Sequence, residues 1–287
     1  MTDGFINLNK PSGMTSHDAV NLVRRIFSTR KVGHAGTLDP AASGVLPIAI
    51  NRATKFIEYL DDDKSYRAEI LFGVATDSGD LEGSIIARAD DFIMPTADKL
   101  NATLKDFIGE IEQTPPKFSA IKIHGRKAYD LARKDIAFDM PSRRVKIHRL
   151  ELLTLSKNTA AIVIDCGKGT YIRSLARDLG ERLNLPATLK SLVRLRVGDF
   201  DLNNALTLDD IKNIGADCLL PIEDCLNYLP RFELDERRVK AFMNGLPTNV
   251  HVPDERALLI FAGGKFLGVG RIERGELRSS TLRLEKI

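Results

Sequence analysis

A glycine-rich run from Arg30 to Leu46 places the strongest constraint on how this chain folds. Its three glycines let the backbone turn tightly or approach another molecule closely. The run also contains His34 and Asp39, and glycine-rich connections that carry such side chains are frequent places for chemistry. We therefore expect a functional loop here. The basic flanks of the run indicate an anionic target.

Periodic patterns predict the elements around this loop. Alternating apolar and polar residues predict strands over 4–9 and 66–72, and an apolar run predicts a buried strand over 160–166. Thr15 and Asp18 form a capping-box pattern before a helix. Glycines 33 and 36 are expected to end that region in a loop.

Two further helices are expected, over 98–109 and after the Gly167–Thr170 turn. The second helix carries an apolar stripe, and Arg173 lies in its first turn, off that stripe. Tyr66 shares its strand face with apolar residues, so it points toward a core or a pocket beside one.

The pattern changes after Pro230. One short helix is expected over 232–245, and short apolar runs between glycine and charged turns over 256–284 predict a small β-domain. A chain of 287 residues is long enough for one large and one small domain. We place the large domain at 1–229 and the small one at 230–287.

Positive charge is concentrated in one segment. Between Lys117 and Arg149 there are ten lysines and arginines against three aspartates, a net charge of +7, whereas the whole chain carries +3 and the remainder −4. Such a block indicates a surface for phosphates. Charge alone supports a solvated charged face equally well.

Several function classes are excluded by missing patterns. Gly-Lys pairs and Gly-x-Gly occur, but the further residues of a phosphate loop or a dinucleotide fingerprint do not. The five histidines lack metal-ligand spacing, and the three cysteines form no Cys-x-x-Cys pair. We therefore expect no metal, no cofactor and buried thiols. No signal pattern or membrane-spanning apolar run is present, so we expect a cytoplasmic protein without a membrane partner.

Asp39 and Pro40 support two interpretations. Asp is a favoured N-cap and Pro a favoured first helical residue, so the pair is typical of a helix start. A carboxylate in a glycine-rich loop also suits a nucleophile, provided that a cation keeps it ionised. Arg173 is a candidate cation, although a helix arginine is more often exposed. Tyr171 either stacks on an RNA base or covers the core. His34 either stacks on an RNA base or is a loop histidine without a function.

Several stretches together resemble the bacterial tRNA pseudouridine synthases of the TruB type. They are spread over about the first 200 residues, in the order found in the family. The matching stretches are Gly4–Ser16, Val32–Pro47, Tyr66–Ala68, Gln113–Tyr129, Pro141–Val145, Cys166–Leu175 and Ser191–Phe200. Two departures are that Val193 replaces a usual arginine and that the C-terminal domain matches loosely.

The resemblance implies roles for the reacting groups. Asp39 resembles the catalytic aspartate, and Arg173 resembles the arginine paired with it. Tyr66 resembles the tyrosine that stacks on the target uracil and is a candidate for proton transfer. Tyr171 and Leu195 resemble pocket-lining residues.

The resemblance also implies contacts that support binding. His34 resembles the histidine that helps hold the opened tRNA loop. Lys10 and Pro11 belong to a motif with a supporting role near the pocket. The segment 117–145 resembles a mobile element that closes over the tRNA loop, in agreement with its charge.

The implied fold is α+β: a mixed, largely antiparallel sheet with helices, followed by a small PUA-like β-domain. The implied reaction converts uridine to pseudouridine at position 55 in the T loop of tRNA, after the base has been flipped out. Attack by Asp39 on C1′ of the ribose, attack on C6 of the base and a glycal route all stay open. We expect the T arm of tRNA as partner, no obligatory protein partner and a monomer.

Two other functions stay open. An RNA-binding or RNA-folding protein would keep the basic segment but would not need Asp39, Tyr66 and Arg173 together. A guide-dependent synthase of the eukaryotic and archaeal type would use protein partners and a guide RNA. The segment 117–145 favours a stand-alone enzyme.

Overall fold

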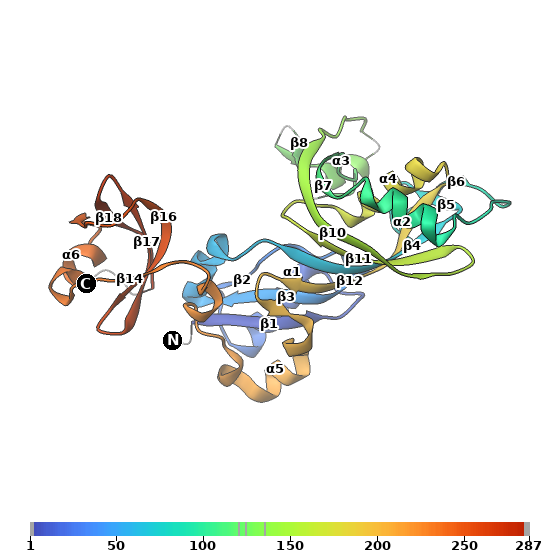
Figure 1. Ribbon diagram of the computed structural model, residues 1–287. Coiled ribbons are helices and arrows are strands. Elements are labelled where there is room, and N and C mark those ends of the chain that lie inside the picture. Colours follow the sequence, from blue (N-terminus) through green and yellow to red (C-terminus); the bar gives the residue numbers. More distant parts are fainter. Residues whose placement is uncertain (1–2, 120, 124, 135, 284–287) are drawn as a thin grey trace.

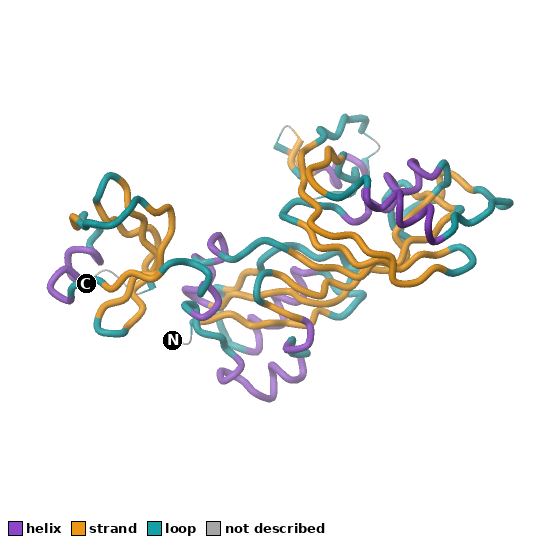
Figure 2. The backbone as a smooth tube through the Cα atoms, in the orientation of Figure 1, coloured by secondary structure: helices purple, strands orange, loops and turns teal. Residues whose placement is uncertain are grey.

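The computed structural model describes residues 3–283 except 120, 124 and 135. Both chain ends and parts of the expected basic segment therefore lie outside the described residues. Strands make up most of the central body and of the C-terminal part, and helices lie around them (Figures 1 and 2).

Within the described residues, nine strands form one large sheet, in the order β1-β3-β12-β4-β11-β10-β7, with β2 on β3 and β13 on β12. The strands are β1 (Gly4–Lys10), β2 (Val32–His34), β3 (Ser43–Ile50), β4 (Lys64–Phe72), β7 (Gly109–Gln113), β10 (Arg143–Leu155), β11 (Thr159–Cys166), β12 (Ala187–Val197) and β13 (Phe200–Asp201). The β12–β3 pair is parallel, and the other pairs of this sheet are antiparallel. This confirms the expected mixed, largely antiparallel sheet with helices.

Two pairs of helices pack on this sheet, and a short helix lies in the basic segment. They are α1 (Ser16–Ile26), α2 (Ala97–Lys105), α3 (Ala128–Ala132), α4 (Ile172–Leu183) and α5 (Leu208–Ile214). Helices α2 and α4 cover the half of the sheet that contains β4, β10, β11 and β12, whereas α1 and α5 pack with β1 and β3. Two small hairpins pair β5 (Val74–Thr76) with β6 (Ile85–Arg88) and β8 (Lys122–Ile123) with β9 (Arg126–Lys127).

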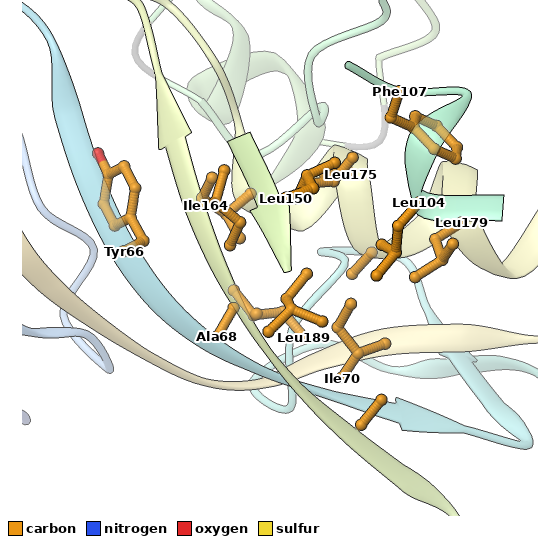
Figure 3. Close-up of a cluster of buried hydrophobic side chains, with 14 of the residues drawn as sticks. Tyr66, Ala68, Ile70, Leu104, Phe107, Leu150, Ile164, Leu175, Leu179 and Leu189 are labelled. Atoms are coloured by element: carbon orange, nitrogen blue, oxygen red, sulfur yellow. The ribbon is translucent and has the colours of Figure 1, made fainter. Parts of the chain in front are cut away.

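The local patterns explain these elements. Thr15 caps α1 and forms a reciprocal capping box with Asp18, as expected. The alternation in β4 places Tyr66, Ala68 and Ile70 in one buried cluster against Leu175 of α4 (Figure 3). The strands expected over 4–9 and 160–166 are also confirmed.

Three local predictions are corrected. The helix expected over 98–109 ends at Lys105. Gly33 lies in strand β2 rather than in a loop. No helix follows Asp39: a turn closed by the bond from the Ala42 N–H to the Asp39 carbonyl leads directly into β3, so the N-cap interpretation is wrong. The alternative of an exposed helix arginine does not apply to Arg173, because its side chain is buried.

The C-terminal part forms a second sheet, in the order β14-β16-β17-β18-β15. Its strands are β14 (Arg231–Glu233), β15 (Thr248–Asn249), β16 (Glu255–Ala262), β17 (Lys265–Glu273) and β18 (Glu276–Leu282), with the helix α6 (Val239–Met243) beside them. Phe266 of this sheet packs against Phe56, with ring centroids 5.9 Å apart, so the two sheets share a buried cluster. Among the described residues, no helix is long and apolar enough to cross a membrane.

Candidate functional site

Asp39 lies in the loop between β2 and β3, and the segment that leads into α1 holds this loop from one side. The Ser16 hydroxyl donates to the Leu38 carbonyl and accepts from the Leu38 N–H, both at 2.9 Å. The Gly13 N–H donates to the Pro40 carbonyl at 2.9 Å. The backbone on both sides of Asp39 is therefore fixed, while 37% of its side chain stays exposed.

Lys10 also connects the Asp39 loop to the segment that leads into α1. Its buried ammonium donates to the carbonyls of Pro11 at 2.8 Å, Met14 at 2.7 Å and Pro40 at 3.4 Å. Burial and the charge of Arg194 lower the pKa of Lys10 to about 8, and the opposite charge of Asp39 partly offsets them. Lys10 thus holds the loop through backbone carbonyls and does not point into solvent.

Arg173 meets Asp39 directly. Its Nη2 donates to Oδ1 of Asp39 at 3.2 Å, and its Nε lies 3.0 Å from Oδ2, although that N–H is not aligned for a hydrogen bond. The two residues are 134 positions apart in the chain. Only 7% of the Arg173 side chain is exposed, so the guanidinium is a fixed, largely desolvated cation behind a partly exposed carboxylate.

Three further groups orient the Arg173 guanidinium. Nη1 donates to the Ser78 carbonyl at 3.0 Å and Nη2 to the Phe118 carbonyl at 3.0 Å. Oδ2 of Asp80 lies 3.5 Å from Nη1. Asp80 is not among the residues predicted from the sequence, although an acidic turn with a glycine between two short strands was a usable signal.

Tyr66 lies on β4, where its register partners are Arg194 on β12 and Ile164 on β11. The ring belongs to the buried apolar cluster, and Figure 3 shows its hydroxyl pointing away from the other side chains of that cluster. Burial raises the pKa of Tyr66, and its interaction with Arg194 opposes that rise. The hydroxyl is therefore protonated at neutral pH.

Tyr171 is the N-cap residue of α4, and it has no side-chain cap of its own. The buried side chain of Gln113 replaces the cap: Oε1 accepts from the Tyr171 N–H at 2.8 Å, and Nε2 donates to its carbonyl at 3.1 Å. The Arg143 guanidinium stacks 4.8 Å from the centre of the Tyr171 ring and donates to the Gly169 carbonyl. The sequence predicted no role for Gln113, and it placed Arg143 only in the basic segment.

The remaining predicted residues lie around this centre. His34 ends β2, five residues before Asp39. Burial, followed by the charges of Arg194 and His17, lowers its pKa, so the imidazole is neutral at neutral pH. Leu195 is half-buried at a bulge in β12. The leucines of this strand that share the cluster of Tyr66 are Leu189 and Leu192.

The family models decide what kind of protein this is. One model, the N-terminal domain of TruB family pseudouridylate synthases, matches residues 24–172, and the tRNA pseudouridylate synthase B C-terminal domain matches 173–227. The chain belongs to the TruB family. It is an enzyme of the isomerase class, a pseudouridine synthase, and the resemblance seen in the sequence is confirmed.

Curated relatives agree over most of the chain. The tRNA pseudouridine synthase B of Bacillus pumilus is 43% identical over 91% of this chain and 90% of its own length. That of Dehalococcoides mccartyi is 47% identical over 85% and 83%. That of Caldanaerobacter subterraneus subsp. tengcongensis is 40% identical over 98% and 99%.

Solved structures show the same fold. A chain from a Cbf5-Nop10-Gar1 complex superposes with a TM-score of 0.75 at 25% identity, covering 99% of this chain and 84% of that one. A chain from an H/ACA RNP bound to a substrate RNA containing 2′-deoxyuridine gives 0.73 at 24% identity, with the same coverage.

Proposed function

We propose that this synthase converts the uridine at position 55, in the T loop of tRNA, to pseudouridine. The observation that carries the proposal is the contact of Arg173 with both carboxylate oxygens of Asp39, at 3.2 and 3.0 Å. A half-exposed carboxylate backed by a buried cation suits attack on a substrate that enters from outside. The relatives named tRNA pseudouridine synthase B support tRNA as that substrate.

The chemistry breaks the bond from N1 of uracil to C1′, turns the base and forms a bond from C5 to C1′. The proton on C5 then moves to N1, and no net oxidation occurs. Asp39 attacks C1′ or C6, or supports loss of a C2′ proton on a glycal route. In each route the carboxylate reacts as an anion, and the Arg173 guanidinium lies 3.0 Å from its Oδ2 as the neighbouring positive charge.

The two tyrosines, Tyr66 and Tyr171, bind the base. Tyr66 lies on a fixed strand. Its ring suits stacking on the detached uracil, and its protonated hydroxyl suits proton transfer to or from that base. Tyr171 offers a second ring at the start of α4, backed by the Arg143 guanidinium. Leu195 is assigned to the pocket wall. Unstacking the target base costs a few kcal/mol, which these contacts offset.

Binding of the tRNA loop is assigned to the surroundings of the site. The neutral imidazole of His34 suits stacking on an unpaired base, because a neutral ring is cheaper to cover than a charged one. The basic segment 117–145 supplies phosphate contacts, and the C-terminal residues 230–287 act as a PUA-like RNA-binding domain. We propose a cytoplasmic monomer that needs no cofactor, metal or obligatory protein partner.

The experiment incubates the purified chain with an unmodified tRNA transcript and maps pseudouridine along the RNA. We expect modification at position 55 without added protein or guide RNA. A transcript with cytidine at that position is the substrate control. Asp39→Asn is the enzyme control, because it keeps the side-chain shape but removes the ionised carboxylate. Pseudouridine at another position only, a requirement for a guide RNA, or turnover by the Asn variant would overturn the corresponding part of the proposal.

A further inference from the structure

Arg194 is the largest of the fully buried side chains, and no carboxylate of the described residues forms an ion pair with it. A buried charge is costly unless its hydrogen bonds are satisfied. Backbone carbonyls satisfy this one. Nε donates to Val45 at 2.7 Å, Nη2 to Gly36 at 3.0 Å and Nη1 to Thr37 at 3.4 Å.

These three carbonyls lie on both sides of Asp39. Gly36 and Thr37 precede it in the loop, and Val45 follows it in β3. One planar guanidinium therefore closes the loop that carries the carboxylate. Ser16 and Lys10 hold the same loop from the opposite segment, so Arg194 supplies the second of two clamps.

The position of β12 in the sheet brings Arg194 next to the strands that carry the other parts of the site. β12 lies between β3 and β4, and Arg194 pairs with Gly44 on one side and with Tyr66 on the other. Gly44 has a φ of +107°, and a Cβ there would lie 2.2 Å from the Arg194 carbonyl oxygen. The backbone of β3 thus approaches β12 as closely as a glycine permits. Arg194 is thereby connected to both the loop of Asp39 and the strand of Tyr66.

We propose that Arg194 is a positioning residue for the reaction. By binding both ends of the loop that carries Asp39, it fixes the Asp39 carboxylate relative to Arg173 and Tyr66. The proposal rests on the proposed function. A reacting group displaced by about 1 Å can lose on the order of a hundredfold in rate. A planar fork can reach several carbonyls at once, whereas the single ammonium of lysine cannot.

The test compares Arg194→Met and Arg194→Lys with Arg196→Met as the matched control. Arg196 is the next arginine on β12, and its guanidinium donates to the Gly198 carbonyl, away from the loop. The dissociation constant for tRNA is measured first for each variant. The rate of pseudouridine formation is then measured in a single turnover, with enough enzyme to bind all of the tRNA. We expect tRNA affinity within about threefold for all variants.

The rates separate positioning from stability. We expect about a hundredfold loss for Arg194→Met, a smaller but clear loss for Arg194→Lys and no loss for the control. A purely structural role would lower the unfolding midpoint while the folded, tRNA-bound fraction reacts at the normal rate. That result, or variants too unstable to bind tRNA, would overturn the proposal.

A second readout does not depend on activity. The charge of Arg194 contributes to the lowered pKa of His34, after burial and alongside His17. In Arg194→Met the His34 pKa, followed by NMR, should rise toward its ordinary value, and in Arg194→Lys and Arg196→Met it should stay low. An unchanged pKa in Arg194→Met would show that the charge is not sensed at the site. Lack of activity in the native enzyme would instead contradict the proposed function alone.

Discussion

The Arg173 guanidinium turns its Nε and Nη2 edge toward Asp39, with contacts of 3.0 and 3.2 Å. The remaining nitrogen, Nη1, meets the Ser78 carbonyl and Asp80. Each of the three guanidinium nitrogens therefore faces a named oxygen, and this fixes the position of the guanidinium relative to the Asp39 carboxylate.

Replacing Arg173 with lysine keeps the charge but removes the planar fork. We expect Arg173→Lys to lose at least about a hundredfold in single-turnover rate while its tRNA affinity stays nearly native, since the loss falls on geometry at the reacting carboxylate. Rapid quench with tritium release from the C5 position of uridine measures the rate. A near-native rate would show that the pair with Asp39 does not take part in the reaction.

Asp80→Asn keeps the shape of the side chain but removes its charge from Nη1 of Arg173. Because the carboxylate lies 3.5 Å from Nη1 and helps to orient the guanidinium that faces Asp39, we expect a single-turnover rate roughly tenfold below native. The tRNA affinity should not change. As a control, Asp90→Asn changes an exposed carboxylate that pairs with Arg88 at the surface, and it should react normally. Equal rates for both variants would contradict the prediction.

Gln113→Leu should destabilise the fold. The substitution leaves the N–H and the carbonyl of Tyr171 without the amide that now binds both. Two lost hydrogen bonds at a buried position correspond to about 2–4 kcal/mol of unfolding free energy. Urea denaturation measures the change. Substitutions at exposed positions usually change the unfolding free energy by less than about 0.5 kcal/mol, so a loss below that value would argue against a stabilising role of the two Gln113 hydrogen bonds.

Thr15→Ala tests the capping box of α1. The Thr15 hydroxyl accepts from the Asp18 N–H at 3.0 Å, and its loss should cost about 1 kcal/mol of unfolding free energy. Thr15→Ser keeps the oxygen and should retain most of the stability. Thermal unfolding of the two variants side by side measures the difference, and equal midpoints would show that the cap contributes nothing.

Lys10 should make stability depend on pH in the alkaline range. Its pKa falls from 10.5 to about 8 on folding, so between these values the unfolded chain binds more protons than the folded one. Stability from this group is therefore fully present above about pH 10.5 and is lost as pH falls to about 8. Urea denaturation across this range should show a rise with pH that is absent in Lys10→Met, whatever the overall stability of the variant. Parallel curves would contradict the shift.

Local patterns were sufficient for many elements. The capping pair Thr15 and Asp18 predicts the start of α1, and the alternation around Tyr66 predicts the buried face of β4, because both depend on residues a few positions apart. The same logic failed at Asp39-Pro40, since a helix start and a tight turn favour the same two residues. The bonds from Gly13 and Ser16 decide for the turn, and neither lies in the local pattern.

By itself the sequence determined the strands and helices with clear periodicity, the family and the candidates Asp39, Tyr66 and Arg173. Only the tertiary structure decided their partners. Arg194 reaches Val45 across 149 positions because β12 lies parallel to β3, and Asp80 reaches Arg173 because a hairpin folds back onto α4. Periodicity specifies which face of an element is buried, whereas the neighbour of that face depends on the order of strands in the sheet.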